Sequence, residues 1–299
     1  MNELHTVAFS GGLGSGFVLA VLCEKLNLRP VLLHTDTKYE TDDTYEFMES
    51  VANYYDLEVE YVADGRTPEQ LFWDEHLLGN DIFPVCSHKL KADQCDAWIL
   101  RKQIEKFFPV MYLGIMPDEP KRMERLRNRY NHMGAGPEIP VHFPLSDPER
   151  PERTSREAGE LLSEAIGWRS SVSNQTMAMW FNKRGIETPE AYKLGFSHNN
   201  CKGECVRAGL GHWYQMYMKK QEGFQRAAMR EYRFATEVYP LTKKGNGHPA
   251  LDSRGFPTVT FLKRKGRPLS LLEMEQMIKH GWSPGDRSGR DNLPCMCEV

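Results

Sequence analysis

Val7-Ala-Phe-Ser-Gly-Gly-Leu-Gly-Ser-Gly16 is the stretch that decides the fold of this chain. It joins a short apolar run at residues 4–9 to a segment whose apolar residues recur with helical spacing, namely Phe17, Val18, Leu19, Val21, Leu22 and Leu26. At a helix N-terminus, unpaired backbone N–H groups and the helix dipole favour an anion, and glycines let it approach the backbone closely. The stretch therefore predicts a phosphate-binding loop between a strand and a helix.

The type of loop follows from its residues. It lacks the Gly-Lys-Ser/Thr ending of a Walker loop, and its glycine spacing is not that of a dinucleotide fingerprint. It resembles the Ser-Gly-Gly-x-Asp-Ser loop of the PP-loop ATP pyrophosphatases, with matches at Ser10, Gly11, Gly12 and Ser15. Gly14 stands where that family usually has Asp. A glycine-rich turn that binds no ligand is the structural alternative.

Composition predicts a globular protein of ordinary solubility. The chain has 299 residues, 40% of them hydrophobic and 26% charged, and a net charge of −3. That charge argues against a uniformly basic surface. No apolar run approaches the roughly 20 residues that span a bilayer, and the N-terminus has no signal-like segment, so we expect a cytosolic protein without membrane contact. The seven cysteines then favour thiols or metal ligands over a disulfide framework.

Strand and helix patterns alternate in the first half. We expect strands at 4–9, 30–35, 57–62 and 110–115, and helices at 41–55 and 90–107. Such alternation predicts a Rossmann-like parallel sheet with helices on both faces and ligands at the carboxyl ends of the strands. After the polar stretch 146–154 we expect helices at 155–166, 173–183, 189–194, 204–234 and 269–280, and a strand at 258–262. We therefore predict a nucleotide-binding α/β domain at 1–145 and a mainly helical, cysteine-bearing region at 146–299.

Two further segments resemble phosphoadenosine-phosphosulfate reductases and their relatives. The stretch 33–47 is similar to the family's strand end and following helix, which implies that Asp36 and Thr37 lie beside the nucleoside. Val85-Cys-Ser-His-Lys-Leu-Lys91 is similar to the family's cysteine-then-lysine segment, which implies that Lys89 balances phosphate charge. A turn-capping Asp36 and solvated lysines are the alternatives.

Gly114-Ile-Met-Pro-Asp-Glu-Pro-Lys-Arg122 resembles the family's Gly-Ile-Arg-x-x-Glu-x-x-Arg segment. The match implies a nucleotide contact at Gly114 and a phosphate contact at Arg122. Met116 replaces the first Arg, which speaks against a doubly charged sulfonucleotide, because such a group favours a bidentate guanidinium. The segment also begins a basic stretch that forms either a solvated face or a docking surface for a nucleic acid: Lys121, Arg122, Arg125, Arg127 and Arg129.

Asn199-Asn-Cys-Lys-Gly-Glu-Cys205 places two thiols four positions apart at the start of an expected helix, where they share a face and both reach one metal. With Cys295 and Cys297 they make four thiolates, enough for Zn²⁺ or a [4Fe–4S] cluster, and Cys86 is a further candidate ligand. The pattern resembles a group of phage and bacterial PP-loop proteins, described as phosphoadenosine-phosphosulfate-reductase-like, that combine such a segment with a Cys-x-Cys tail. Structural zinc and buried thiols are the alternatives.

Together the resemblances imply an enzyme that binds ATP with Mg²⁺, adenylates an oxygen of its acceptor and releases pyrophosphate. The implied catalytic residues are Ser10, Ser15, Lys89 and Arg122. A cluster would supply sulfur, so the predicted reaction is thiolation of a nucleic acid or a nucleobase-like acceptor. A sulfonucleotide reductase and a non-catalytic nucleotide-binding module of a phage or defence system are the alternatives, and a homo-oligomeric assembly stays open.

Overall fold

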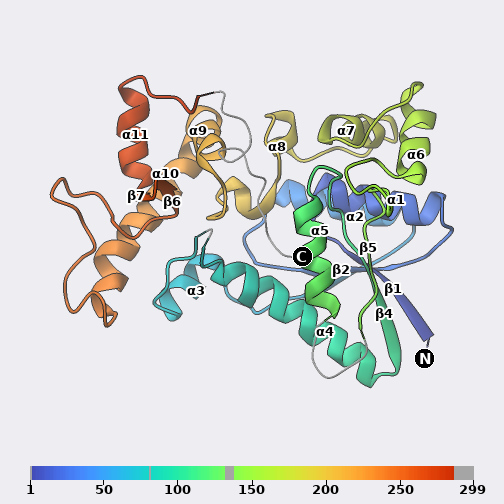
Figure 1. The fold of residues 1–299 in the computed structure, drawn as a ribbon, viewed down its shortest axis with the longest axis horizontal. Helices are drawn as coiled ribbons and strands as arrows, with labels where there is room; N and C mark the ends of the chain where they lie inside the picture. The colour runs from blue at the N-terminus through green and yellow to red at the C-terminus, as the bar shows by residue number, and fades with distance from the viewer. Residues whose placement is uncertain (1, 81, 132–137, 286–299) are drawn as a thin grey trace.

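A five-stranded parallel sheet forms the centre of the molecule in the computed structural model, which describes residues 2–80, 82–131 and 138–285 (Figure 1). The strand order is β3-β2-β1-β4-β5, and the strands are β1 (Asn2–Ala8), β2 (Val31–Thr35), β3 (Val59–Val62), β4 (Phe107–Tyr112) and β5 (Val141–His142). The predicted α/β class with a Rossmann-like parallel sheet is confirmed. Because the order reverses between β1 and β4, the point where ligands bind in such sheets lies between these two strands.

Both faces of the sheet are covered because alternate strand residues point to opposite sides. One face packs on α1 (Leu13–Glu24) and α2 (Asp42–Tyr54) through Val7, Leu32, Val110 and Tyr112. The other packs on α4 (Asp93–Ile104) and α5 (Pro120–Asn131) through Ala8, Leu33, Met111 and Leu113. The short α3 (Pro68–Asp74) follows β3 and begins with a capping box at Thr67.

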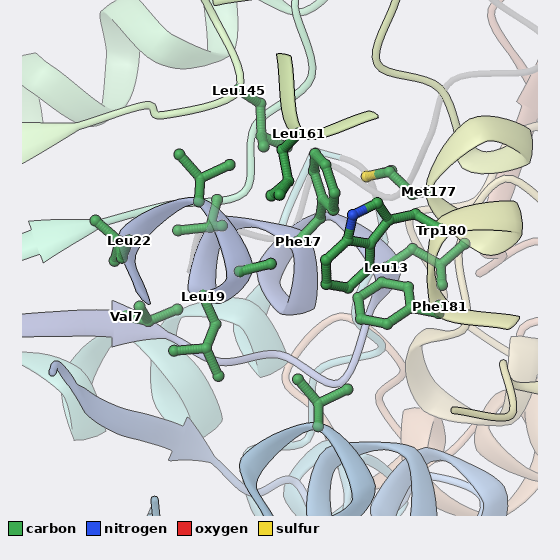
Figure 2. Packing of buried hydrophobic residues seen from close by; sticks show 14 of the residues in the cluster. Val7, Leu13, Phe17, Leu19, Leu22, Leu145, Leu161, Met177, Trp180 and Phe181 are labelled. Atoms are coloured by element: carbon green, nitrogen blue, oxygen red, sulfur yellow. The ribbon is translucent and has the colours of Figure 1, made fainter. Parts of the chain in front are cut away.

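Helix α1 is apolar on all sides and is enclosed by a second layer of helices. Its residues from Phe17 to Leu22 are at most 1% exposed. The outer layer is formed by α6 (Arg156–Ile166) and α7 (Asn174–Lys183), and the rings of Phe17 and Trp180 meet edge to face with centroids 5.3 Å apart (Figure 2). A helix that is hydrophobic all round needs this enclosure, which fixes the glycine loop at its start.

The remaining elements form a separate apolar cluster beside the sheet. They are α8 (Glu190–Lys193), α9 (Leu210–Lys219), α10 (Gln221–Arg233), the hairpin β6 (Leu262–Arg264) with β7 (Arg267–Leu269), and α11 (Leu271–Lys279). The prediction of a single helix at 204–234 is wrong. Helix α9 starts only at Leu210, and the helix is interrupted at Lys220, whose φ of −138° and ψ of 60° are not helical. No helix in the described part of the chain has the length and apolar character to cross a membrane.

Further element boundaries differ from the prediction, among them the strand expected at 110–115, which is β4 at Phe107–Tyr112. The helix expected at 90–107 is a π-helical turn, Ser87–Ala92, followed by α4, and β4 already begins at Phe107. The strand expected at 258–262 lies at Leu262–Arg264, because the preceding residues pack as an irregular segment and only the hairpin partner β7 provides a ladder.

Candidate nucleotide site and cysteine loop

The loop between β1 and α1 has the geometry of an anion cradle. Gly11 adopts a φ of 77°, which glycine tolerates without strain. The Ser10 N–H donates to Ser15 Oγ at 3.2 Å, and Ser15 Oγ donates to the Gly12 carbonyl at 3.0 Å. Among the described residues, the N–H groups of Gly11, Gly12 and Gly14 have no hydrogen-bond acceptor. These donors at the start of a long helix are therefore available to an anion.

Gly14 marks the contact between the β1 loop and the β4 loop. A Cβ added at Gly14 would lie 2.8 Å from the carbonyl oxygen of Gly114, and one added at Gly114 would lie 2.5 Å from the Ser15 nitrogen. The two backbones thus touch at the point where the strand order reverses. The Asp usual in PP-loops has no space here, which explains why this chain has glycine at position 14.

A cleft of about 1400 Å³ opens from this contact. Most of the predicted nucleotide residues line it: Ser10, Gly12, Gly14, Ser15, Gly114 and Arg122. Its far wall comes from the second half of the chain and includes Arg153, Arg156, Arg169, Tyr192, His198 and Asn200. The sequence pattern did not indicate these residues, although the hydroxyl-rich run Arg169-Ser-Ser-Val-Ser-Asn174 is a signal for polar contacts.

Arg122 lines the cleft and forms an ion pair with Glu119. Its Nη1 lies 3.1 Å from Glu119 Oε1, and Glu119 Oε2 accepts a hydrogen bond from the Met116 N–H at 3.3 Å. Glu119 thereby fixes both the turn after β4 and the guanidinium. Met116 also lines the cleft, so no second guanidinium stands at that position.

The structure does not bring Asp36, Thr37 or Lys89 into this cleft. The Asp36 carboxylate accepts from the Lys38 N–H and Nζ and from Tyr45 Oη at 2.7–2.8 Å. Burial alone would raise the pKa of Asp36, but these hydrogen bonds outweigh it and lower that pKa. Lys89 is half exposed and lies 3.6 Å from Asp93. All three predicted residues lie outside the residues that line the cleft.

The basic face predicted on α5 is largely engaged within the molecule. Arg129 Nη2 lies 2.6 Å from Asp96 Oδ1, and the Arg127 guanidinium lies 5.2 Å from the centre of the Phe143 ring. Arg122 pairs with Glu119. Lys121 and Arg125 are exposed. Helix α5 therefore does not present an unobstructed cationic docking face.

The cysteine segment is a strained loop and not the helix start that its spacing predicts. Cys201 and Lys202 have φ values of 54° and 57°, and Gly203 has 80°. Left-handed conformations are costly for residues with a Cβ and occur where the surroundings impose them. Cys86, Cys201 and Cys205 nevertheless line one small cavity of about 10 Å³, together with Lys91 and Arg230.

A metal or cluster needs more than these three thiols provide. Within residues 2–80, 82–131 and 138–285, no group of three or more His, Cys, Asp or Glu side chains is arranged to hold a metal ion. A cavity of about 10 Å³ has room for one water molecule, whereas a [4Fe–4S] cluster takes four cysteine ligands. Cys295 and Cys297 lie outside the described residues. The described thiols alone do not fit a cluster.

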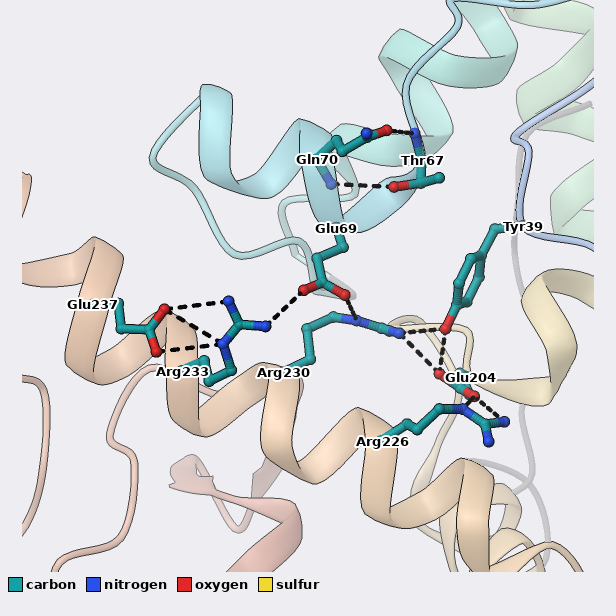
Figure 3. Close-up of polar contacts among 9 residues, drawn as sticks. All are labelled: Tyr39, Thr67, Glu69, Gln70, Glu204, Arg226, Arg230, Arg233 and Glu237. Atoms are coloured by element: carbon teal, nitrogen blue, oxygen red, sulfur yellow. Dashed lines mark hydrogen bonds and ion pairs between the residues drawn. The ribbon is translucent and has the colours of Figure 1, made fainter.

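Buried polar contacts join the cysteine loop to the segment after β2. Glu204, which is completely buried, accepts from Tyr39 Oη at 2.8 Å, Arg226 Nε at 3.0 Å and Arg230 Nη2 at 2.9 Å (Figure 3). Arg230 in turn lies 3.3 Å from Glu69 of α3. Burial raises the pKa of Tyr39 to about 12, so this phenol stays protonated.

Glu40 makes the second connection. Its Oε2 accepts from the Cys201 N–H at 2.6 Å, and its Oε1 lies 3.9 Å from Lys91 Nζ. Asn199 Nδ2 donates to Thr44 Oγ1 at 2.5 Å, and Thr44 packs directly against Gly11 of the glycine loop. The β2–α2 segment therefore contacts both the cysteine loop and the glycine loop.

The comparison with known protein families agrees with this geometry. No curated protein sequence matches the chain. Residues 5–95, which include the second half of β1, the glycine loop, β2, α2, β3 and the cysteine-then-lysine segment, match the model of the phosphoadenosine phosphosulfate reductase domain. This stretch is therefore similar to a family of adenine-nucleotide enzymes, and the similarity supports a nucleotide-using enzyme with a Rossmann-like sheet.

Proposed function

We propose that the chain is a nucleotidyl-activating enzyme that converts ATP to AMP and pyrophosphate in the cleft between β1 and β4. The observation that carries the proposal is the glycine loop, whose N–H groups at residues 11, 12 and 14 have no acceptor among the described residues and which lies at the point of strand-order reversal. The similarity of residues 5–95 to an adenine-nucleotide family supports the choice of ligand.

The chemistry follows from the position of the donors. An oxygen of the acceptor attacks the α-phosphorus of ATP, and the bond from that phosphorus to the oxygen of pyrophosphate breaks. The loop N–H groups, Ser10 and Ser15 would stabilise charge on the departing pyrophosphate, because donors fixed in place need no reorganisation during the reaction. Arg122 would hold a phosphate oxygen, and Lys89 stays a predicted contributor from resemblance alone. Mg²⁺ would neutralise phosphate charge, and the exposed carboxylates that line the cleft, Asp118, Glu152 and Glu160, would be available to hold it.

The acceptor and the sulfur source form the finer part of the proposal. A sulfur nucleophile would displace AMP from the activated carbon, giving a thiolated nucleic acid or nucleobase-like product. Support comes from the cysteine loop, because His198 and Asn200 beside it line the cleft. A cluster would need Cys295 and Cys297 in addition to Cys201 and Cys205. An anaerobic absorption spectrum with metal analysis tests this, and a colourless protein with one zinc would refute the sulfur relay.

Incubation with α-³²P-labelled ATP and Mg²⁺ tests the reaction itself. Production of AMP, with pyrophosphate, supports the proposal. Release of sulfite from a sulfonucleotide would instead support a reductase, against which Met116 stands. ATP binding without turnover, in the presence of candidate nucleic acids, would support a non-catalytic module. Ser10→Ala with Ser15→Ala should reduce AMP formation at least about 100-fold, while Ser253→Ala, at an exposed hydroxyl outside the cleft, serves as the matched control.

A further inference from the structure

Tyr192 of α8 reaches the first turn of α1 from the second half of the chain. Its phenolic oxygen accepts a hydrogen bond from the Leu13 N–H at 3.3 Å, and Tyr192 lines the cleft beside the phosphate loop. A Cβ added at Gly12 would lie 3.1 Å from the same oxygen. Glycine at position 12 therefore leaves the space that the hydroxyl needs.

The Tyr192 hydroxyl has a proton to donate. Because the Leu13 N–H already uses a lone pair of the phenolic oxygen, the O–H must find its acceptor elsewhere. No described residue accepts it. Burial raises the pKa of Tyr192 to about 12, so the proton stays on the oxygen at neutral pH. The hydroxyl thus adds a side-chain donor to the N–H groups of the loop.

The short helix α8, which carries Tyr192, is held by neighbouring helices at both ends. The Glu190 N–H at the start of α8 donates to Asp43 Oδ2 of α2 at 2.7 Å. At the other end, the Leu194 carbonyl accepts from Gln215 Nε2 of α9 at 3.0 Å. Donors held in place before the ligand arrives lose less freedom on binding, which strengthens recognition.

We infer that Tyr192 donates its O–H to a phosphoryl oxygen of the nucleotide held by residues 10–15. The inference rests on the proposed function, because it needs a nucleotide phosphate in the cleft. It assigns a binding residue outside the stretch that matches the reductase domain, and it makes the phosphate cradle a product of both halves of the chain. The ligand class that uses this donor is a polyphosphate, so adenosine without phosphate gains nothing from it.

Calorimetric titration of Tyr192→Phe with ATP, inorganic pyrophosphate and adenosine tests the inference. The variant keeps the ring and loses only the hydroxyl. Because the lost hydrogen bond goes to a charged group, affinity for ATP and pyrophosphate should fall about 10- to 100-fold, while adenosine affinity should not change. Tyr214→Phe is the matched control, since Tyr214 packs on Trp282 away from the cleft.

Each outcome separates the inference from the proposed function. Equal affinity of Tyr192→Phe and the unaltered chain for ATP and pyrophosphate would overturn the inference alone. A parallel loss of adenosine affinity would also overturn it, because a purely structural role predicts that result. If the unaltered chain binds neither ATP nor pyrophosphate, both proposals fall. Gly12→Ala, whose methyl group would displace the hydroxyl, gives a second test, because adding Tyr192→Phe to it should cost no further pyrophosphate affinity. A further loss as large as in the unaltered chain would overturn the inference.

Discussion

Residue 14 lies where the β1 loop touches the backbone of Gly114, and even a methyl group there is too large. Because the neighbour is a carbonyl and not a flexible side chain, Gly14→Ala must shift one loop, at a cost of about 1–3 kcal/mol. We expect ATP affinity to fall about tenfold or more, and Gly14→Asp, which restores the usual PP-loop residue, to bind no better. Fluorescence or calorimetric titration with ATP measures both.

Gly159→Ala provides the control for this substitution. Gly159 also lines the cleft, but a Cβ there meets its nearest atom, in the Thr154 side chain, at 3.8 Å, an ordinary contact. ATP affinity should be unchanged. If Gly14→Ala and Gly159→Ala behave alike, the backbone contact has no role in shaping the site.

Buried His34, near the carboxyl end of β2, makes the stability of the fold depend on pH. Its Nδ1–H donates to the Phe9 carbonyl at 2.8 Å, and burial lowers its pKa to about 4. Below about pH 6.5 this histidine is protonated in the unfolded chain but stays neutral in the folded one. The free energy of unfolding therefore falls as the pH drops from about 6.5 to about 4, by at most about 1.4 kcal/mol per pH unit. Urea unfolding of the unaltered chain and of His34→Gln across this range should show the steeper fall in the unaltered chain; parallel curves would contradict the assignment.

At the scale of elements, Glu231 holds the C-terminal hairpin and α11 onto α10. It is completely buried, and its two oxygens accept from the Phe261 N–H at 2.8 Å and the Leu271 N–H at 2.7 Å. Burial raises its pKa to about 8, against the lowering effect of these bonds. Between about pH 4.5 and 8 the folded chain holds the extra proton, so this group makes stability fall as pH rises.

Glu231→Gln tests this role. The amide turns a donor toward one of the two N–H groups, so the free energy of unfolding should fall by about 1–3 kcal/mol at pH 5. The variant should also lack the downward slope between pH 5 and 8. Urea unfolding at both pH values measures the two effects, and Glu222→Gln, an exposed position on the same helix, should leave both unchanged.

Local patterns predicted the elements whose own residues decide them. Alternation and apolar runs located β1, β2 and β3 and the helices α2, α6, α7 and α11 to within a few residues. The prediction failed where contacts distant in sequence decide the backbone. Cys201 and Lys202 adopt left-handed conformations in a loop whose Cys201 N–H donates to Glu40, and no helical pattern around residue 204 could reveal that partner.

The candidate site divides in the same way. Ser10, Gly12, Gly14 and Ser15 could be proposed from the sequence because a glycine-rich loop is a contiguous motif, and the structure places all four at the cleft. Gly114 and Arg122 followed from resemblance. Tyr192 carried no signal, since a tyrosine in a four-residue helix has many uses and only the tertiary fold brings it to Leu13. Sequence patterns do not reveal residues that reach a site only through packing between segments distant in the chain.

At the scale of the whole molecule, the buried pair of Glu40 and Lys91 ties the sheet edge to the cysteine loop. The pair is 3.9 Å apart with side chains 2% and 7% exposed, whereas the nearby Lys89–Asp93 pair is closer, at 3.6 Å, but half exposed. Burial and not distance sets the value of such pairs. Glu40→Gln should lower the free energy of unfolding by about 3 kcal/mol and Asp93→Asn by less than about 1 kcal/mol.

Urea unfolding measures both variants, and a second readout isolates the loop. Because Glu40 accepts the Cys201 N–H, its loss should also speed the reaction of the Cys201 and Cys205 thiols with a maleimide. Adding Lys91→Met to Glu40→Gln should recover part of the lost stability, since no charge is then left buried without its counter-ion. Equal losses from Glu40→Gln and Asp93→Asn would refute the ranking by burial.

The contact between Tyr192 and Leu13 also bears on how the protein emerges from the ribosome. About 180 residues separate the glycine loop from the tyrosine. At about 5 to 20 residues per second, translation leaves the loop without this partner for roughly 10 to 40 s. For about the first half of that interval β4, which must pair with β1, is also still to come. Under the proposed function, a nucleotide that binds before Tyr192 has packed would be held about 10- to 100-fold more weakly than in the completed fold.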